Sequence, residues 1–220
     1  FGNTTAITRL PTDGASVIPT PVSNVTTTYG SLWNQLGANI IGGVAGDESG
    51  TSVSISADGT IVAVGARSNS TNRGTVRVYR YNNVSWVQMG TDINGEASSD
   101  YSGQSVSLSA NGRILAIGAN MNDGSGNLLP DSGHVCIYEF NGTNWVQRGG
   151  DIDGEANGDQ SGISVSLSED GSTVAIGAIM NDGSGNALSN SGHVRVYRYN
   201  ASKTIPQLTN QNLSTFGPAG

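Results

Sequence analysis

The chain repeats one alternating pattern of apolar and polar residues. Each copy opens with a stretch in which serine alternates with an aliphatic residue, and a two-residue Asp-Gly or Asn-Gly turn follows. Such a turn between alternating stretches is the strongest short signal for a β-hairpin. The alternating stretches are residues 52–56, 105–109 and 164–168, and the turns are residues 58–59, 111–112 and 170–171. The pattern therefore predicts a β-hairpin at the same place in three repeats.

The rest of each repeat predicts further strands. The hairpin closes with a strand such as Ile114-Leu-Ala-Ile-Gly-Ala119, and a third strand follows a variable loop, as in Gly133-His-Val-Cys-Ile-Tyr138. A fourth strand starts at a tryptophan, as in Trp145-Val-Gln-Arg-Gly149. The repeats span residues 47–99, 100–158 and 159–200. We therefore expect tandem four-stranded antiparallel units.

The first two strands of each unit separate large and small side chains onto two faces, because successive residues of a strand point to opposite sides. In the second repeat, Val106 and Leu115 belong to the bulky face, whereas Ser105, Ala116 and Gly118 belong to the small face. A bulky face packs closely on the small face of a neighbouring unit and buries apolar surface there. We expect an all-β fold of tandem blades of the β-propeller type, with an open β-stack or solenoid as the alternative.

The segments outside the repeats lack this period. Residues 1–30 are rich in Thr and Pro and are interpreted as an extended arm or linker, residues 31–200 as the repeat region, and residues 201–220 as a C-terminal tail. A copy of the fourth-strand motif, Trp33-Asn-Gln-Leu-Gly37, precedes the first repeat, and the motif decays after the third. Three units do not complete a propeller of typical size. The chain is therefore expected to be part of a longer one, to be completed by blades of another subunit, or to stack openly with ends that another chain covers, and we expect self-association.

The ordered motifs of the repeat resemble the FG-GAP repeat of integrin α-subunit propellers and related extracellular proteins. The matching residues are Ser102-Gly-Gln-Ser-Val106, Asn111-Gly112, Ile117-Gly-Ala119 and Gly133-His-Val-Cys-Ile-Tyr138. Two features depart from the family pattern: serine replaces its opening phenylalanine, and its calcium loop is reduced to a two-residue turn. The resemblance implies an extracellular or surface-exposed, non-enzymatic propeller that serves adhesion, recognition or matrix assembly.

Charge and cysteine content exclude several classes of function. The net charge of -7, with only 10 Lys and Arg residues, argues against a nucleic-acid partner, which requires clustered basic residues. The sequence contains no apolar run long enough to span a bilayer as a helix. A single cysteine, Cys136, rules out a disulfide within the chain.

Two repeated loops carry candidate chemistry. The loop Met-Asn-Asp-Gly-Ser-Gly-Asn occurs in the second and third repeats and offers oxygen ligands for calcium, although a plain turn is the favoured interpretation. Its candidate ligands are Asn122, Asp123, Asn181 and Asp182. An Asp and a Glu also recur after the fourth strand, but a catalytic pair occurs once in one cleft. We therefore expect no catalytic residues, no enzyme activity and no cofactor other than calcium.

The two histidines and the cysteine lie on third strands. His134 and His193 occupy equivalent positions, and neither is expected to form a zinc site within its own repeat. Cys136 takes the place of Arg77 and Arg195, on the strand face opposite Val135 and Ile137, and an inert strand cysteine is the favoured interpretation. The recurrent tryptophans are interpreted as packing anchors, with sugar stacking as the alternative.

Glycosylation sequons support an extracellular setting. Those at Asn83, Asn141 and Asn200 all fall in or beside the turn after the third strand, where a glycan would meet solvent; the others are Asn3, Asn24, Asn69 and Asn212. We hypothesise an extracellular or cell-surface glycoprotein with a structural or adhesive role, in a larger surface assembly or filament. Its expected partners are copies of itself or other surface or matrix proteins. A carbohydrate-binding module, with glycans as partners, is the alternative.

Overall fold

The computed structural model describes residues 33–183 and 188–201. The chain divides into two units, residues 1–35 and residues 36–220, and every strand described below belongs to the second unit. All the sheets are antiparallel, which confirms the predicted all-β class. No helix among the described residues is long and apolar enough to cross a membrane. The predicted arm, most of the predicted tail, and the decayed fourth-strand motif lie outside the described residues.

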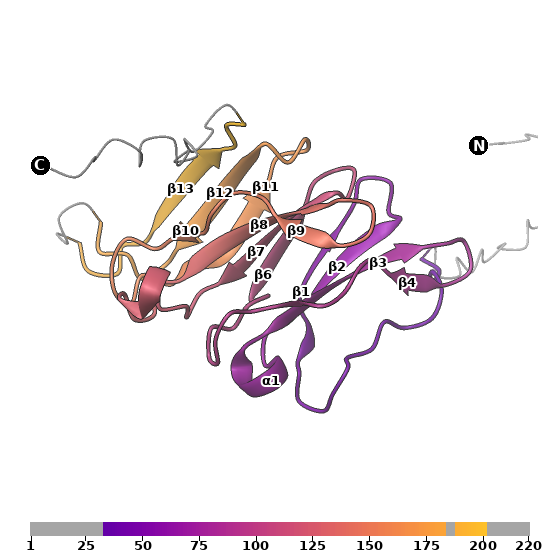
Figure 1. Cartoon of the computed structure of the whole chain (residues 1–220), viewed down its shortest axis with the longest axis horizontal. Coiled ribbons are helices and arrows are strands. Elements are labelled where there is room, and N and C mark those ends of the chain that lie inside the picture. Colours follow the sequence, from indigo (N-terminus) through magenta and orange to yellow (C-terminus); the bar gives the residue numbers. More distant parts are fainter. Residues whose placement is uncertain (1–32, 184–187, 202–220) are drawn as a thin grey trace, which may run out of the picture. The chain divides into compact units, whose positions relative to one another are not determined.

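Each repeat forms one sheet, and up to the fourth strand the neighbours in the sheet follow the sequence order (Figure 1). The first sheet contains β1 (Ser49–Ile55), β2 (Ile61–Ala66), β3 (Thr75–Tyr81), β4 (Trp86–Gln88) and β5 (Ile93–Asn94). The second contains β6 (Ser105–Leu108), β7 (Ile114–Ala119), β8 (His134–Phe140), β9 (Trp145–Gln147) and β10 (Ile152–Asp153). The third contains β11 (Ser161–Leu167), β12 (Thr173–Ala178) and β13 (His193–Arg198). Two single turns, α1 (Asn69–Asn72) and η1 (Ser125–Asn127), lie in the loops before β3 and β8.

The strands lie where the repeat predicts them, with two differences. The short strands β5 and β10 were not predicted: β5 pairs with the start of β3, and β10 pairs with the start of β8. Two residues are too few to show an alternating pattern, so only the pairing in the fold identifies them. The first strands β1 and β11 also begin earlier than predicted, because each continues past a register shift in its pairing with the next strand.

Local chemistry explains the hairpin turns. In the second repeat, the Asn111 side-chain oxygen accepts hydrogen bonds from the Ser109 hydroxyl and the Arg113 N–H, each 2.9 Å long. The Ser109 hydroxyl oxygen in turn accepts the Ile114 N–H at 3.0 Å. Gly112 adopts φ +65°, a conformation that a side chain disfavours. The residues of the Asn-Gly motif therefore fix the turn and the register of the two strands.

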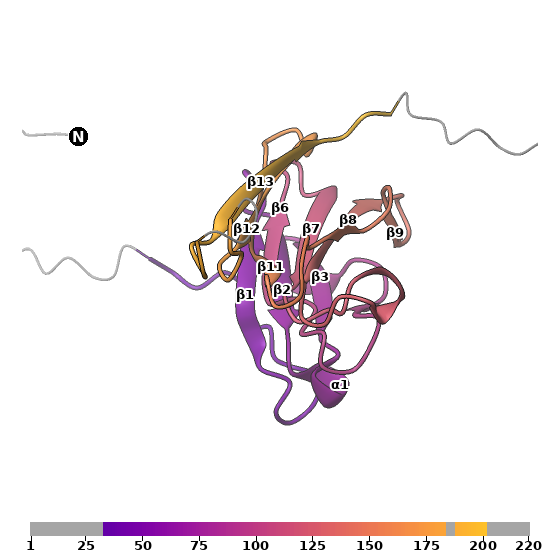
Figure 2. The ribbon, with the colours of Figure 1, turned by 90° about the vertical axis from the view of Figure 1, so that its left-hand side faces the viewer.

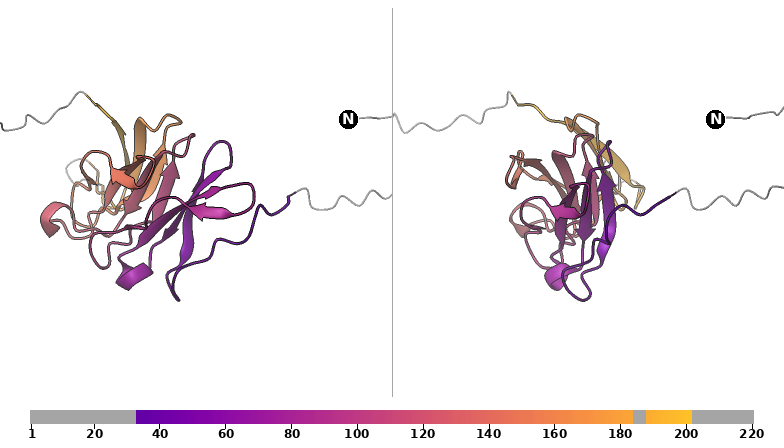
Figure 3. Two further views of the ribbon diagram at one scale, coloured as in Figure 1. Left: turned by 45° about the vertical axis from the view of Figure 1, so that its right-hand side comes forward. Right: turned by 90° about the vertical axis from the view of Figure 1, so that its right-hand side faces the viewer.

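The three sheets pack face to face in the order of the repeats. The first strands β1, β6 and β11 lie side by side (Figures 1 and 2), and Figure 3 shows the order of the sheets from two further sides. The bulky face of each following sheet meets the small face of the sheet before it, as predicted. Between the first and second sheets the core contains Ile61, Ala63, Val76, Val78, Val106, Leu108, Leu115 and Ile117. Between the second and third it contains Ala116, Val135, Val174 and Ile176.

Glycine and serine on the small faces allow the backbones of adjacent sheets to touch. A Cβ atom on Gly118 would lie inside 3.0 Å of the Gly162 carbonyl oxygen, closer than Cβ atoms essentially ever come to other atoms. Beside it, the Ser105 hydroxyl donates a 2.7 Å hydrogen bond to the same oxygen. We call the interface between two adjacent sheets a seam. The seam between the first and second sheets has the same contact, because the Ser52 hydroxyl donates a 2.7 Å hydrogen bond to the Gly103 carbonyl oxygen. The small face is therefore a specific surface for the next sheet.

Candidate functional site

The first sheet leaves the bulky side chains of its first strand exposed. On β1, Val53 is 65% exposed and Ile55 is 60% exposed. Their counterparts on the second sheet, Val106 and Leu108, are each 8% exposed because the first sheet covers them. The exposed face therefore repeats a surface that is buried one repeat further along the chain.

The third sheet leaves the complementary small face exposed. On β13, Val194 is 67% exposed and Val196 is 64% exposed, whereas the counterpart of Val194 in each of the other two sheets, Val76 or Val135, is fully buried. A Cβ atom on Gly177 would come within 4 Å only of Ser164, on its own sheet. No sheet covers this face within residues 33–183 and 188–201. The described array thus ends in two different apolar faces that match each other.

A groove of about 870 Å³ lies beside the edge of the third sheet, between it and the second. Its lining includes Arg148, Gly149, Tyr197 and Tyr199. In the second sheet the equivalent place holds Trp145, which packs on the core and donates a 3.0 Å hydrogen bond to the Met89 carbonyl oxygen. Arg148 is the repeat counterpart of Met89. The groove therefore lies where a fourth-strand tryptophan of the third repeat would sit.

The residues just before β1 behave as the end of a preceding repeat. The Trp86 indole donates a 2.8 Å hydrogen bond to the Leu36 carbonyl oxygen, as Trp145 does to that of Met89. Leu36 and Met89 hold the same place in the two copies of the Trp-x-Gln-x-Gly motif. Trp86 and Trp145 are thus packing anchors, as predicted, and Leu36 stands where a preceding unit would contribute its fourth strand.

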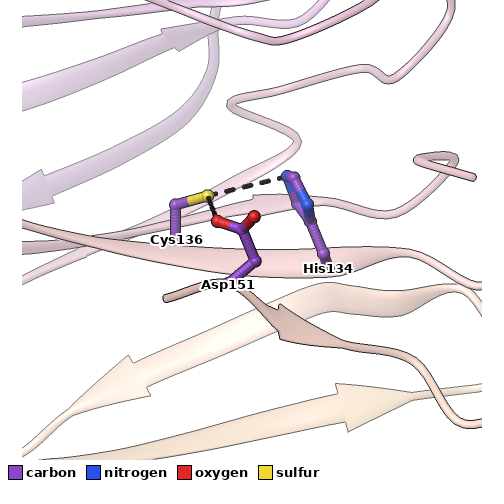
Figure 4. Close-up of side chains that lie close together, drawn as sticks. All are labelled: His134, Cys136 and Asp151. Carbon is purple, nitrogen blue, oxygen red and sulfur yellow. Dashed lines mark hydrogen bonds between the residues drawn. The ribbon is translucent and has the colours of Figure 1, made fainter. Parts of the chain in front are cut away.

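A third feature is a cluster of possible metal ligands on the second sheet (Figure 4). The Cys136 thiol donates a hydrogen bond to an Asp151 carboxylate oxygen at 3.1 Å, and its sulfur lies 3.7 Å from His134 Nε2. The three ligand atoms lie within 4.8 Å of one another. The structure thus places two possible ligands from the same repeat beside His134, and the prediction that no zinc site forms there stays a prediction. His134 and Cys136 are two residues apart on β8, so their side chains share a face, a signal already present in the sequence.

The cluster is largely buried. His134 is 4% exposed and Cys136 is 5% exposed, whereas Asp151 lies at the surface. Burial, followed by the neighbouring carboxylate of Asp151, raises the pKa of the Cys136 thiol, and the charge of Glu96 adds to this. The thiol is therefore protonated at neutral pH in the absence of a cation.

The predicted calcium loops form hydrogen-bonded turns. The Asn122 side chain donates to Asp100 at 3.1 Å and accepts the Gly124 N–H at 2.8 Å, while Asp123 accepts the Asp131 N–H at 3.1 Å. The third repeat repeats this arrangement at Asn181 and Asp182. The candidate side chains thus order their own loops, and calcium binding there stays a prediction.

Two of the recurrent acidic residues, Asp92 and Glu155, form ion pairs with third-strand arginines. Asp92 lies 2.8 Å from the Arg77 guanidinium. Burial opposes ionisation of Asp92, but its hydrogen bonds with Arg77 and Gln88 outweigh this and lower its pKa. Between the second and third repeats, Glu155 lies 3.6 Å from both Arg195 and His193. These carboxylates connect neighbouring segments of the array.

The sequons in the described residues lie at or near the surface. Asn83, Asn141 and Asn200 are exposed, and Asn69 is half-buried. The other three, Asn3, Asn24 and Asn212, lie outside the described residues. The positions of Asn83 and Asn141 in exposed turns agree with the predicted accessibility.

Comparison with known proteins gives no family. No protein-family model matches the chain, and no curated protein matches it. Among solved structures, one similar chain is named a putative 6-phosphogluconolactonase from Bacteroides uniformis, with 12% sequence identity and a TM-score of 0.45. The match covers 69% of this chain and 37% of that one, so this chain spans well under half of its length.

That comparison corrects one expectation. The similar structure is named as an enzyme, which contradicts the prediction that this chain belongs to a non-enzymatic class. The prediction came from the family resemblance and from the recurrence of the Asp and Glu residues, and neither tests for activity. At this level of similarity, the comparison carries no reaction over to the chain.

Proposed function

We propose that this protein is a building block of an extracellular surface assembly, in which propeller-type blades continue from one copy of the chain into the next. A single observation carries the proposal: the two exposed end faces are copies of the two halves of the internal seams. Val53 and Ile55 repeat the bulky half, and Val194 and Val196 repeat the small half. The occupant of each face is a second copy of this chain, joined end to end. Such a head-to-tail contact generates rings or filaments.

The internal seams specify the contacts of this interface. In both seams a small-face serine donates to the glycine carbonyl oxygen of the next sheet. A second serine accepts a backbone N–H: Leu108 donates to Ser54 and Leu167 donates to Ser107, each at 2.9 Å. By the same rule, Ser164 of one copy donates to the Gly50 carbonyl oxygen of the next, and Ser166 accepts its Ile55 N–H. The interface would thus pair its polar groups by hydrogen bonds while it buries apolar side chains.

The segment before β1 completes the third sheet of the neighbouring copy. Trp33 begins a motif that matches Trp145-Val-Gln-Arg-Gly149 and so supplies the fourth strand that the described third sheet lacks. Its indole enters the groove beside Tyr199 and donates to the Arg148 carbonyl oxygen, as Trp145 does to Met89. Strand addition at a sheet edge supplies backbone hydrogen bonds, and the aromatic pocket sets the register.

Sequence features support the extracellular setting. Asn83 and Asn141 lie exposed in the turns between third and fourth strands, where attached glycans would meet solvent. The ordered motifs that resemble FG-GAP repeats point the same way. A chain with a net charge of -7 repels its copies, so we expect added salt to strengthen the association.

The test is the mass of the full chain in sedimentation velocity over a range of concentrations. The wild type is expected to form larger species as its concentration rises. Val53→Lys and Val196→Lys each place a charge on one end face and should reduce this growth. Val146→Lys is the matched control, because Val146 is 50% exposed on the middle sheet, which has neighbours on both faces.

Mixing the two end-face variants tests the head-to-tail geometry. Val53→Lys keeps an intact third sheet and Val196→Lys keeps an intact first sheet, so an equimolar mixture should form capped dimers that neither variant forms alone. A monomeric wild type at every concentration would refute the proposal, as would equal effects of all three lysine variants. Deletion of residues 1–37 should also prevent growth. If deletion of residues 202–220 prevents it instead, the tail occupies the groove. Electron microscopy distinguishes closed rings from open stacks.

Carbohydrate binding is the second candidate, favoured by the groove alone. Tyr197 and Tyr199 contribute aromatic rings to its lining, and Arg148 lies 3.9 Å from the centre of the Tyr199 ring. Aromatic rings stack on sugar rings, and an arginine donates to their hydroxyls. Binding on a glycan array that Tyr199→Ala removes would support this role. Binding that persists in Tyr199→Ala would place any sugar elsewhere.

A further inference from the structure

The second repeat lacks a positive charge that the other two repeats possess. Arg77 and Arg195 stand at equivalent positions in the first and third repeats, and each pairs with a carboxylate, Asp92 or Glu155. The second repeat has Cys136 at this position, yet it retains the carboxylate of Asp151. Glu96, the counterpart of Glu155, acts on the same cysteine from the first repeat. Two carboxylates thus surround a neutral thiol where the other repeats place a cation.

We propose that His134, Cys136 and Asp151 bind a thiophilic divalent cation, of which zinc is the representative. The thiol, imidazole and carboxylate form a ligand set typical of zinc. The His134 imidazole is 4% exposed, and its Nδ1 atom has no hydrogen-bond partner among the described residues. Its other nitrogen faces only the weakly bonding sulfur (Figure 4). Metal binding at these three residues does not depend on self-association.

The distances suit such an ion. Ligand bonds of about 2.3 Å to sulfur and about 2.0 Å to nitrogen place a tetrahedral S–N pair roughly 3.5 Å apart. Cys136 Sγ and His134 Nε2 lie 3.7 Å apart. Asp151 Oδ1 lies 3.1 Å from the sulfur, and the Asp151 side chain is exposed, so a small rotation lets it share the ion.

Binding of the cation releases one proton. The cation replaces the thiol hydrogen that now bonds to Asp151, and this proton leaves to solvent; a neutral imidazole donates its lone pair and releases none. The bound charge then compensates Asp151 and Glu96, as arginine does in the other repeats. Because Glu96 belongs to the first repeat, the ion strengthens the seam between the first and second sheets.

The experiment titrates the untagged full chain with Zn²⁺ or Co²⁺ alone. We expect one equivalent of Zn²⁺ to bind with release of about one proton and to raise the unfolding temperature, and Co²⁺ to give a sulfur-to-metal charge-transfer band. The chain has one cysteine and two histidines, so each ligand is tested singly. His134→Ala and Cys136→Ser should abolish the band. Cys136→Arg should also abolish it, while keeping the fold because it restores the arginine of the other repeats.

His193→Ala is the matched control, because His193 occupies the equivalent place in the third repeat beside Arg195 and should leave metal binding unchanged. Cobalt binding without a sulfur band would overturn the proposal, as would equal losses in His134→Ala and His193→Ala. The proposal would also be overturned if the wild-type chain unfolds cooperatively, and is therefore folded, but binds no Zn²⁺. Glu96→Gln should weaken binding without removing the band, which separates its charge effect from that of the three ligands.

Discussion

Substituting glycine by alanine on two equivalent small faces measures the specificity of sheet stacking. Gly118 and Gly177 pair in the same register with Ser105 and Ser164 on their own sheets. A methyl group meets the serine of its own sheet in both positions. Only at Gly118 does it also meet the backbone of the next sheet, at Gly162. The difference between the two variants therefore isolates the effect of stacking.

The structure sets the size of the difference. Overpacking against a fixed backbone costs about 1–3 kcal/mol, and the displaced Gly162 carbonyl also weakens its hydrogen bond from Ser105, worth about 0.5–1.5 kcal/mol. Gly118→Ala should thus lose about 2–4 kcal/mol of unfolding free energy, or about 5–15 °C in midpoint temperature for a chain of this size. Gly177→Ala should stay within about 1 kcal/mol of the wild type, because alanine is favoured over glycine in a strand.

Urea unfolding followed by tryptophan fluorescence measures both variants, at concentrations where the chain is monomeric. Trp145 packs on the first seam and reports its opening. The midpoint should fall for Gly118→Ala while the denaturant slope stays constant. If Gly177→Ala were destabilised as strongly as Gly118→Ala, the loss would come from the strand itself, and the argument that glycine permits close sheet contact would fail.

Two further predictions concern a turn and the core. Hydrogen bonds from the Ser168 hydroxyl and the Ser172 N–H hold the pKa of Asp170 at about 2, below its ordinary 3.8; its stabilisation is therefore present above pH 3.8 and lost as the pH falls towards 2. Asp170→Asn, which copies Asn111, should flatten this acid loss in urea midpoints from pH 2 to 5, and an unchanged acid slope would contradict it. Leu115→Ala, at a fully buried position, should cost about 2–5 kcal/mol, more than Val62→Ala at its half-buried counterpart on the first sheet; equal losses in thermal unfolding would refute the burial argument.

Local sequence determined the strands and their faces. The Asn111-Gly112 turn fixes a hairpin through contacts among neighbours in the chain, and alternation assigns Val106 and Ser105 to opposite sides. Repetition of this unit also predicted that bulky faces would meet small ones. These features needed no tertiary information, because turn chemistry and strand period act within a few residues. The positions of the second, third and fourth strands followed in the same way.

Tertiary structure alone decided which copies of a shared pattern are covered. Val135 and Val194 both follow a Gly-His pair, yet one is fully buried and the other 67% exposed, because within the described part of the chain a sheet follows only the first. The same distinction applies to the residues of the metal-ligand cluster. His134 and Cys136 share a strand face by their spacing, which the sequence shows, whereas Asp151 reaches them only because the chain returns through β9 to pair β10 with β8. Contacts between distant segments depend on that return, and no local pattern encodes it.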